Sequence, residues 1–325
     1  MNNELVKVES LKKYFSLKSG LLGNNKKIVK AVDNISFSIN KGETFGLVGE
    51  SGCGKSTTGK MVLRLLEPTS GKVFFKGEEL TSKSGKELLA IRPNLQMIFQ
   101  NPYGSLDPKM TLKTILEEPL KIHGVNKNSR EKRIKELLSY ISFSSSYLDR
   151  HPGEFSGGQL QRIAIARSLA LNPQFIVADE PVSALDVSIQ AQILNLLIDL
   201  QKELELTYLF ISHDLSVVQY VSDRVGVMYL GRMVELADCE SLYNNPLHPY
   251  TRLLLSSVPI ADPERASQRK KVEINKGSQQ KTSNGCRFCS RCNEKLAICE
   301  EEVPELIEYS KGHFVSCHLY NKEHI

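Results

Sequence analysis

The stretch GESGCGKS, residues 49–56, decides the fold, because a glycine-rich loop here joins an apolar segment to a helical pattern. The preceding segment TFGLVG has the composition of a strand. Apolar residues from Met61 to Leu66 recur at helical spacing before Pro68, which should stop the helix. The spacing G-x-x-x-x-G-K-[ST] wraps phosphates in backbone amides and points a helix N-terminus at them. The order of strand, loop and helix therefore predicts an α/β fold of the P-loop NTPase class.

The positions of this loop have separate expected roles. Its three glycines allow the tight turn and the close approach of backbone to phosphate. Lys55 is expected to hold the terminal phosphates and Ser56 to take a place on Mg²⁺, while Cys53 should act through its backbone rather than its sulfur. The predicted nucleotide contacts are Gly49, Glu50, Ser51, Gly52, Cys53, Gly54, Lys55, Ser56 and Thr57.

The segments around the loop give a coarse secondary structure. Residues 30–48 contain the apolar-rich segments VKAVDNISFSI and TFGLVG, separated by a charged turn at Asn40-Lys41-Gly42, which predicts two strands joined by a hairpin. Between residues 100 and 156, MTLKTILEEPLKIHGV and REKRIKELLSYIS carry apolar residues at helical spacing. A helical region is therefore expected after the first strands.

Two adjacent carboxylates end the apolar strand FIVADE, residues 175–180. Ligand sites of α/β proteins lie at the carboxyl ends of strands. Asp179 is expected to bind Mg²⁺ through water, and Glu180 to act on an attacking water as general base or orienter. Paired acids after a strand are also common on solvated surfaces, and this segment alone leaves that alternative open.

A second loop of small residues opens the helical stretch EFSGGQLQRIAIARSLA, residues 154–170. Exposed amides at a helix N-terminus bind phosphate groups. The first loop already holds its own nucleotide, so Ser156 and Gly158 are expected to bind a nucleotide held by another subunit.

Together these motifs resemble those of the ATP-binding subunits of ABC transporters. Residues 49–56 are similar to the Walker A loop, Phe155–Gln159 to the signature motif, and Phe175–Glu180 to Walker B with its catalytic glutamate. Phe155 stands where the signature usually begins with Leu.

Further motifs of the same family follow in the expected order. Gln100 in QMIFQNP is similar to the Q-loop, Ser183–Asp186 to the D-loop and His213 in FISHD to the switch histidine. Tyr14 is similar in placement to the aromatic residue that stacks on adenine, and Phe15 is a neighbouring candidate.

The resemblance implies a fold with a mixed sheet core, an antiparallel β subdomain and a helical subdomain. It also implies that two such domains meet head to tail, so that Walker A of one chain and the signature loop of the other clamp each ATP. Gln100 would bind Mg²⁺ or water, and His213 would bind the γ-phosphate and fix Glu180, so these three are the expected catalytic residues of an ATPase. The nucleotide contacts that the resemblance adds are Tyr14, Ser156, Gly157, Gly158, Gln159 and Asp186.

Composition limits the class of protein. The chain has 325 residues with 41% hydrophobic content, which suits a globular protein with a substantial core. MNNELVKVES lacks the basic flank and apolar run of a secretory signal, so the chain is expected to stay in the cytosol. The formal charge of +5 is modest and comes from intermixed basic and acidic residues, which predicts no nucleic-acid partner.

The sequence around the ATPase motifs indicates which kind of transporter is involved more specifically than the motifs do. FQNPYGSLDPKMTL, DEPVSALDVSIQAQILNLL and NNPLHPYTRLLLSSVP resemble the F-type ATPase subunits of oligopeptide and dipeptide permeases. That family implies a peripheral protein on the cytoplasmic face of the membrane. Its expected partners are a second ATPase subunit in a heterodimer, two membrane permease subunits and an extracellular or periplasmic peptide-binding protein. The alternatives are a nickel or murein-peptide importer, or a non-transport ABC ATPase acting on ribosomes or DNA.

Five of the seven cysteines lie near the end of the chain, in GCRFCSRCNEKLAIC and HFVSCHL. C-x₂-C-x₂-C resembles a ferredoxin loop and also suits zinc. The permease resemblance implies a [4Fe-4S] cluster on Cys286, Cys292, Cys299 and Cys317, with Zn²⁺ as the alternative metal and Cys289 as an alternative ligand. The expected division is a nucleotide-binding domain over residues 1–260, a polar linker over 261–285 and a metal-binding extension over 286–325.

Overall fold

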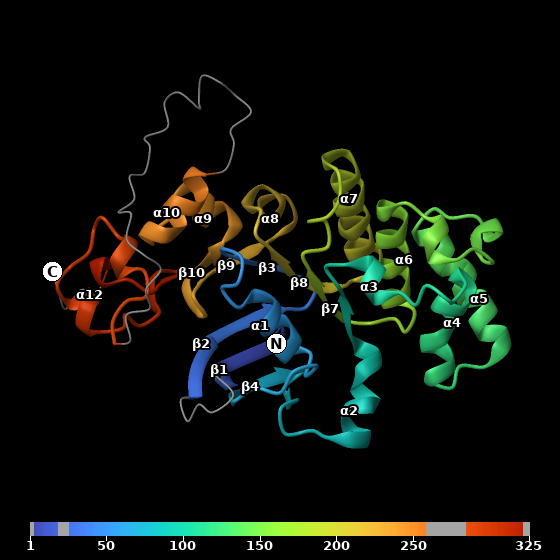
Figure 1. Cartoon of the computed structure of the whole chain (residues 1–325), viewed down its shortest axis with the longest axis horizontal. Helices are drawn as coiled ribbons and strands as arrows, with labels where there is room; N and C mark the ends of the chain where they lie inside the picture. The colour runs from blue at the N-terminus through green and yellow to red at the C-terminus, as the bar shows by residue number, and fades with distance from the viewer. Residues whose placement is uncertain (1–2, 19–25, 258–283, 321–325) are drawn as a thin grey trace. The chain divides into compact units, whose positions relative to one another are not determined.

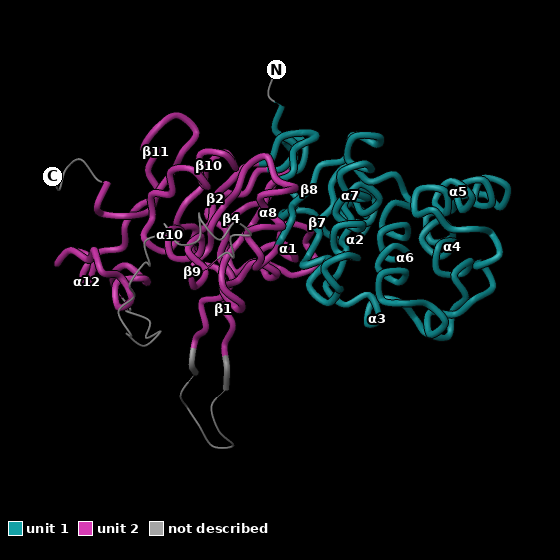
Figure 2. Tube along the Cα trace, turned by 90° about the horizontal axis from the view of Figure 1, so that it is seen from above, with its two compact units in different colours: residues 1–6, 39–44, 75–211 teal, residues 7–38, 45–74, 212–325 magenta. Residues whose placement is uncertain are grey.

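The computed structural model describes residues 3–18, 26–257 and 284–320 (Figure 1). The chain divides into two compact units (Figure 2). Unit 1 comprises Met1–Val6, Ile39–Thr44 and Phe75–Ile211, and unit 2 comprises Lys7–Ser38, Phe45–Phe74 and Ser212–Ile325. Of the predicted linker, residues 261–285, the part from 261 to 283 lies outside the described residues.

Unit 2 contains two groups of strands. The first, in the order β2-β1-β4, comprises β1 (Glu4–Lys18), β2 (Lys26–Asn40) and β4 (Ser70–Phe75). The second has the order β11-β12-β10-β9-β3. Its members are β3 (Thr44–Val48), β9 (Arg224–Tyr229), β10 (Arg232–Asp238), β11 (Ile307–Ser310) and β12 (His313–Val315). Strand β3 runs parallel to β9, and the other pairs of this group are antiparallel, which gives the mixed sheet that the fold class requires.

The prediction of a hairpin across Asn40-Lys41-Gly42 is wrong, because β2 and β3 belong to different sheets. Every residue of β3 is buried, as is typical of a strand inside a parallel sheet. Strand β2 instead alternates buried and exposed positions over its second half. The rings of Phe37 and Phe45 stack with centroids 5.0 Å apart, so apolar packing joins the two strands.

The helices of unit 2 are short. They are α1 (Lys55–Val62), α8 (Leu215–Val221), α9 (Cys239–Asn244), α10 (Pro249–Ser256) and α12 (Ile298–Glu301). Helix α1 ends before the predicted stop at Pro68, because Arg64 adopts a left-handed conformation with φ 53°. Leu65 therefore lies outside the helix and is exposed.

Unit 1 contains the parallel strands β8 (Thr207–Ser212), β7 (Phe175–Asp179) and β6 (Leu95–Ile98), paired in that order. Its remaining elements are β5 (Glu78–Glu79), α2 (Gly85–Ile91), α3 (Pro102–Ser105), α4 (Leu112–Ile122), α5 (Lys127–Tyr140), α6 (Gly157–Leu169) and α7 (Val187–Leu204). Helices α4, α5 and α6 pack on one another (Figure 1), so the predicted helical region is confirmed. In the parts of the chain that the structure describes, no helix is both long and apolar enough to span a bilayer.

The cysteine-rich extension joins the sheet of unit 2 through β12, which pairs with β10 and aligns Val315 with Glu235. Glu235 is fully buried and accepts hydrogen bonds from the backbone N–H groups of Leu247 at 2.7 Å and His248 at 2.9 Å. Its carboxylate also lies 2.8 Å from Nε2 of His313 on β12. One buried carboxylate therefore connects the sheet, the entry to α10 and the extension.

Candidate nucleotide-binding site

The phosphate loop, residues 49–57, packs so closely on its surroundings that two positions require glycine. Gly54 has φ 109°, and a Cβ there would lie 2.3 Å from the carbonyl oxygen of Ala31. Gly49 has φ 152°, and its Cβ would lie 2.2 Å from the carbonyl oxygen of Met228. L-residues with side chains rarely adopt such backbone conformations, and neither site has room for one. The loop therefore takes a single compact form against β2 and β9.

Lys55 begins helix α1 and is buried within the loop. Its ammonium donates to the carbonyl oxygens of Gly49 at 2.7 Å and Glu50 at 3.1 Å. Ser56 and Thr57 follow in the first turn, whose backbone amides carry the partial positive charge of a helix N-terminus. This end of α1 has the character of an anion site.

Cys53 contributes its backbone to the loop. Its carbonyl oxygen accepts a hydrogen bond from the N–H of Gly231, at 2.8 Å, in the turn between β9 and β10. The side chain is buried, and burial raises the pKa of the thiol despite the nearby charge of Lys55. A buried thiol with a raised pKa is a poor nucleophile.

Tyr14, the residue similar to the adenine-stacking aromatic, lies on β1 and is tied to Asp33 on β2. Its hydroxyl donates to the Asp33 carboxylate at 2.5 Å. Burial and the neighbouring carboxylate raise the pKa of Tyr14 to about 12. Burial alone would raise the pKa of Asp33, but the Tyr14 hydrogen bond and the charges of Arg232 and Arg287 outweigh it and lower that pKa. Asp33 is therefore an ionised anchor for the tyrosine.

Three residues of this network do not belong to any motif in the sequence: Asp33, Arg287 and Arg291. Arg287 donates to the Asp33 carboxylate and to the carbonyl oxygen of Leu230. Arg291 forms a bidentate pair with the carboxylate of Glu50 in the phosphate loop, at 3.0 and 3.1 Å. The one available signal was the arginines interleaved with cysteines in CRFCSRC, whose partners lie more than two hundred residues away.

His213 follows β8 directly and is exposed. The next residue, Asp214, caps α8 by accepting from the N–H groups of Ser216 at 2.8 Å and Val217 at 3.4 Å. This cap fixes the point at which the chain leaves the strand. His213 therefore stands at the carboxyl end of a strand, where α/β proteins bind ligands.

In unit 1, Gln100 and Glu180 lie together. The amide of Gln100 donates to the Glu180 carboxylate at 2.8 Å, although eighty residues separate them. Glu180 follows β7 in a left-handed conformation with φ 47°, which its N–H bond to the Ile211 carbonyl at 2.9 Å helps to hold. Such strain in a residue other than glycine concentrates at functional sites. Asp179, the last residue of β7, is buried beside it in the chain.

The signature segment forms the N-terminus of α6. Ser156 caps the helix by accepting from the N–H of Gln159, whose side chain accepts in return from the N–H of Ser156. Phe155 is buried and packs on Phe143 and Tyr147 with centroids 6.0 and 5.9 Å away. That aromatic cluster accounts for Phe in place of Leu.

Three more of the predicted contacts follow: Gly157 and Gly158 lie in this segment, and Asp186 lies at the start of α7. Gly157 and Gly158 open α6, and a Cβ on Gly158 would lie 2.5 Å from Cγ2 of Ile189 in α7. Asp186 is the exposed N-cap residue of α7, and its side chain makes no capping hydrogen bond. The Asp186 carboxylate is thus not required for the cap itself.

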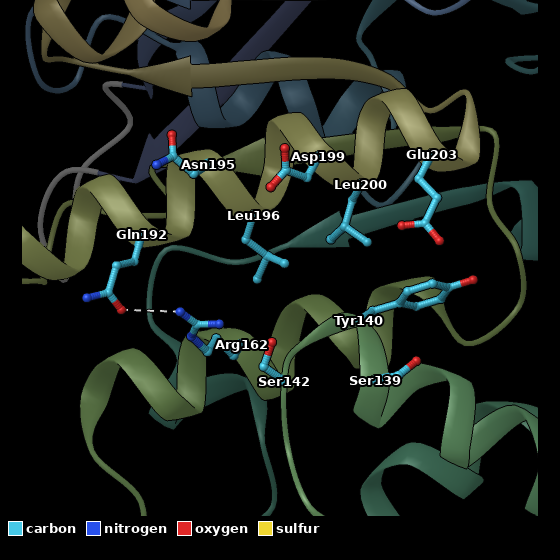
Figure 3. Close-up of a pocket in the computed structure, with 10 residues that line it drawn as sticks. All are labelled: Ser139, Tyr140, Ser142, Arg162, Gln192, Asn195, Leu196, Asp199, Leu200 and Glu203. Carbon is cyan, nitrogen blue, oxygen red and sulfur yellow. Dashed lines mark hydrogen bonds between the residues drawn. The ribbon is translucent and has the colours of Figure 1, made fainter.

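A hollow of about 590 Å³ lies between α5, α6 and α7 in unit 1 (Figure 3). Across it, Arg162 of α6 donates to the side-chain oxygen of Gln192 of α7 at 3.2 Å. Tyr140 and Glu203 line its other end. None of the predicted nucleotide or metal residues lines this hollow.

The five thiols of the extension lie close enough for their charges to interact. Among the described residues, no three His, Cys, Asp or Glu side chains are placed to hold a metal ion. Burial and the thiolate charges of Cys286, Cys292 and Cys299 raise the pKa of Cys317 to about 12. A four-iron cluster presents separate corners to its cysteines. The backbone N–H of Cys286 donates to the carbonyl oxygen of Cys299 at 2.8 Å, which holds two of the predicted ligands side by side.

Known proteins similar to this chain were found by sequence. Residues 32–183 match the family described as ABC transporter, and residues 234–299 match the family described as Oligopeptide/dipeptide transporter, C-terminal region. The Oligopeptide transport ATP-binding protein AppF of Bacillus subtilis (strain 168) is 51% identical over 98% of both chains. The Oligopeptide transport ATP-binding protein OppF of the same organism is 49% identical over 98% of this chain and 97% of its own.

Solved structures agree with these matches. A dimeric post-hydrolysis state of the ATP-binding cassette MJ0796, bound to ADP and Pi, has a TM-score of 0.64 and 30% identity, covering 72% of this chain and 99% of that one. CbiO1 from Clostridium perfringens, part of the ABC transporter complex cbiONQ, has a TM-score of 0.65 and 26% identity, covering 75% of this chain and 92% of that one. The similarity thus extends over both sequence and fold.

Proposed function

Because this chain belongs to the ABC transporter family, we propose that it is the ATP-hydrolysing subunit that powers import of oligopeptides or dipeptides across the cytoplasmic membrane. Nearly full-length relatives named for oligopeptide transport support the cargo class. The observation that carries the chemistry is the Gln100–Glu180 hydrogen bond at the end of β7. This contact supports the proposal because it brings together an amide and a carboxylate, the two groups proposed to hold and activate the water that attacks the γ-phosphate.

The proposed mechanism assigns each step to a residue of this chain. Lys55 and the amides of the phosphate loop hold the β- and γ-phosphates of ATP. Mg²⁺, when bound, neutralises phosphate charge, and its proposed ligands are Ser56, Gln100 and Asp179. Glu180 accepts or orients the proton of the attacking water, and His213 donates to the γ-phosphate.

ATP would be closed between two chains. Ser156, Gly157, Gly158 and Gln159 present the N-terminus of α6, and the exposed Asp186 stands at the start of α7. We propose that these residues complete the nucleotide site of a second ATPase subunit. Closure would then act on two membrane permease subunits served by a peptide-binding protein, with the chain peripheral on the cytoplasmic face.

The test of this proposal is Glu180→Gln, which keeps the shape of the side chain and removes its charge. Turnover of ATP should fall by roughly 10²- to 10⁴-fold, because a general base is lost, while the Kd for ATP should stay within about twofold. The matched control is Glu203→Gln, an exposed α7 residue, which should retain activity. Unchanged ATP hydrolysis in Glu180→Gln would refute the assignment.

We further propose that residues 286–325 form a metal-stapled extension of the nucleotide-binding domain, with a [4Fe-4S] cluster on Cys286, Cys292, Cys299 and Cys317. The proximity of these cysteines supports the proposal: the N–H of Cys286 donates to the carbonyl oxygen of Cys299 at 2.8 Å, and the charges of Cys286, Cys292 and Cys299 act on Cys317. Cys289 acts in the same way on Cys286 and Cys292, so it stays the alternative ligand. Anaerobic purification followed by absorption spectroscopy and iron analysis tests the proposal. Cys317→Ser should lose the iron and Cys289→Ser should keep it; the reverse result would assign Cys289 as a ligand in place of Cys317.

A further inference from the structure

Two arginines of the cysteine-rich extension reach opposite ends of the proposed nucleotide site. Arg287 and Arg291 flank Phe288, Cys289 and Ser290, so both belong to the same short segment of chain. Their side chains are only 11% and 14% exposed, although arginine usually lies on the surface. Both are therefore packed into the structure of unit 2.

Arg287 acts on the adenine end. It is ion-paired with Asp33, whose side chain is 4% exposed and whose carboxylate receives the hydroxyl of Tyr14. Arg232 pairs with the same carboxylate at 3.0 Å. A buried carboxylate needs such partners to remain ionised, and only then is it a strong acceptor for Tyr14. The orientation of the Tyr14 ring thus depends on a residue of the extension.

Arg287 also contacts the turn beside the phosphate loop. It donates to the carbonyl oxygen of Leu230, which has a left-handed conformation with φ 43°. The next residue, Gly231, donates its N–H to the carbonyl oxygen of Cys53 in the loop. The carbonyl oxygen of Gly231 accepts from the N–H of Asp33 at 2.8 Å, so this turn joins the loop to the Tyr14 anchor. Both bonds are between backbone groups, so they do not require the Arg287 side chain.

Arg291 acts on the phosphate end. Its two terminal nitrogens pair with both carboxylate oxygens of Glu50, a geometry with high directional specificity. The N–H of Glu50 meanwhile donates to the hydroxyl of Tyr250 at 2.9 Å. Phe288 packs against Tyr250 with ring centroids 5.5 Å apart, so an apolar contact holds the arginine segment against the loop.

We propose that Arg287 and Arg291 are positioning residues for ATP: Arg287 fixes Tyr14 through Asp33, and Arg291 fixes the phosphate loop through Glu50. The extension then sets the affinity for ATP in addition to any role in assembly. This inference rests on the proposed function, in which Tyr14 stacks on adenine and residues 49–57 hold the phosphates.

The experiment measures the affinity of the full chain for Mg·ATP and for Mg·tripolyphosphate, by competition with a fluorescent ATP analogue. Tripolyphosphate lacks adenine, so it reports on the phosphate end alone. Arg287→Gln should weaken ATP about tenfold and leave tripolyphosphate unchanged, whereas Arg291→Gln should weaken both about tenfold. Arg287→Lys, which keeps the positive charge, should bind ATP more tightly than Arg287→Gln and less tightly than the native chain. Glu294→Gln, which breaks the bidentate pair of the extension with Arg252, should change neither affinity.

A double substitution tests whether Arg287 acts through Tyr14. Tyr14→Ala should weaken ATP but not tripolyphosphate, and adding Arg287→Gln should cause no further loss. Asp33→Asn removes the same ion pair from its other side. It should weaken ATP as much as Arg287→Gln does, and it replaces that variant in the test if Arg287→Gln folds poorly.

Several results would overturn the proposal. Equal weakening of both ligands by Arg287→Gln, or an equal effect of Glu294→Gln, would mean that the extension is only structural support. Normal ATP affinity in Arg287→Gln, together with a loss in Tyr14→Ala, would refute the inference and leave the proposed function intact. An unchanged ATP affinity in Tyr14→Ala would refute the adenine assignment, and the inference with it.

Discussion

Replacing Glu235 with Gln should loosen the attachment of the extension to the sheet. The side chain is 0% exposed and its two oxygens meet three donors: the N–H groups of Leu247 and His248, and Nε2 of His313. In the Gln variant an amide nitrogen replaces one acceptor and faces a donor. Losing one charge-assisted bond and leaving its N–H buried should cost about 2–3 kcal/mol.

Hydrogen–deuterium exchange with mass spectrometry gives the most direct measurement, because it reports local opening of β10 and β12. A loss of about 2–3 kcal/mol corresponds to exchange roughly 30- to 150-fold faster in peptides that contain these strands. The control is Glu305→Gln, at an exposed position of the same extension, which should change stability by less than about 0.5 kcal/mol. Unaltered protection of β12 in Glu235→Gln would refute the reasoning that this carboxylate holds the extension in place.

Two further perturbations have expected outcomes. Burial lowers the pKa of His248 to about 4, so below about pH 6.5 the unfolded state binds a proton that the folded state does not, and stability falls as the pH drops toward 4. Urea unfolding measures this as the drop in the free energy of unfolding between pH 7 and pH 5. The drop should be about 2 kcal/mol smaller in His248→Asn than in the native chain, and equal drops in the two chains would contradict this. Gly54→Ala should destabilise the chain by about 2–4 kcal/mol and abolish nucleotide binding, because its Cβ meets the Ala31 carbonyl. Gly77→Ala, with φ 80° but open space around it, should lose only about 1 kcal/mol and still bind nucleotide.

The local elements of the site could be predicted because their chemistry lies within a few residues. The capping box of α6 is visible as Ser156 followed by Gln159, and the strand before Asp179 is a continuous apolar run. The proximity of Gln100 and Glu180 could be anticipated only through the order of motifs, since eighty residues separate them. The fold class followed from the same motifs.

The parts of the fold and of the site that the sequence did not predict depend on tertiary contacts that no local sequence pattern encodes. Asp33 and Arg287 are 254 residues apart, and neither belongs to a recognised motif. The prediction of a hairpin across residues 40–42 was wrong because a charged turn has the same sequence pattern whether it joins paired strands or leads from one sheet into another. Only the complete burial of β3, which a short apolar segment does not reveal, distinguishes the two cases.

The pairing of β12 with β10 has a consequence for solubility. An uncovered β10 would present a row of unpaired N–H and C=O groups, on which another chain can add a strand and start aggregation. The extension covers that row and leaves β11, only four residues long and carrying Glu308, as the last strand in the order. Short strands and charged side chains both disfavour further strand addition. The cysteine-rich extension therefore also protects this edge of the sheet from self-association.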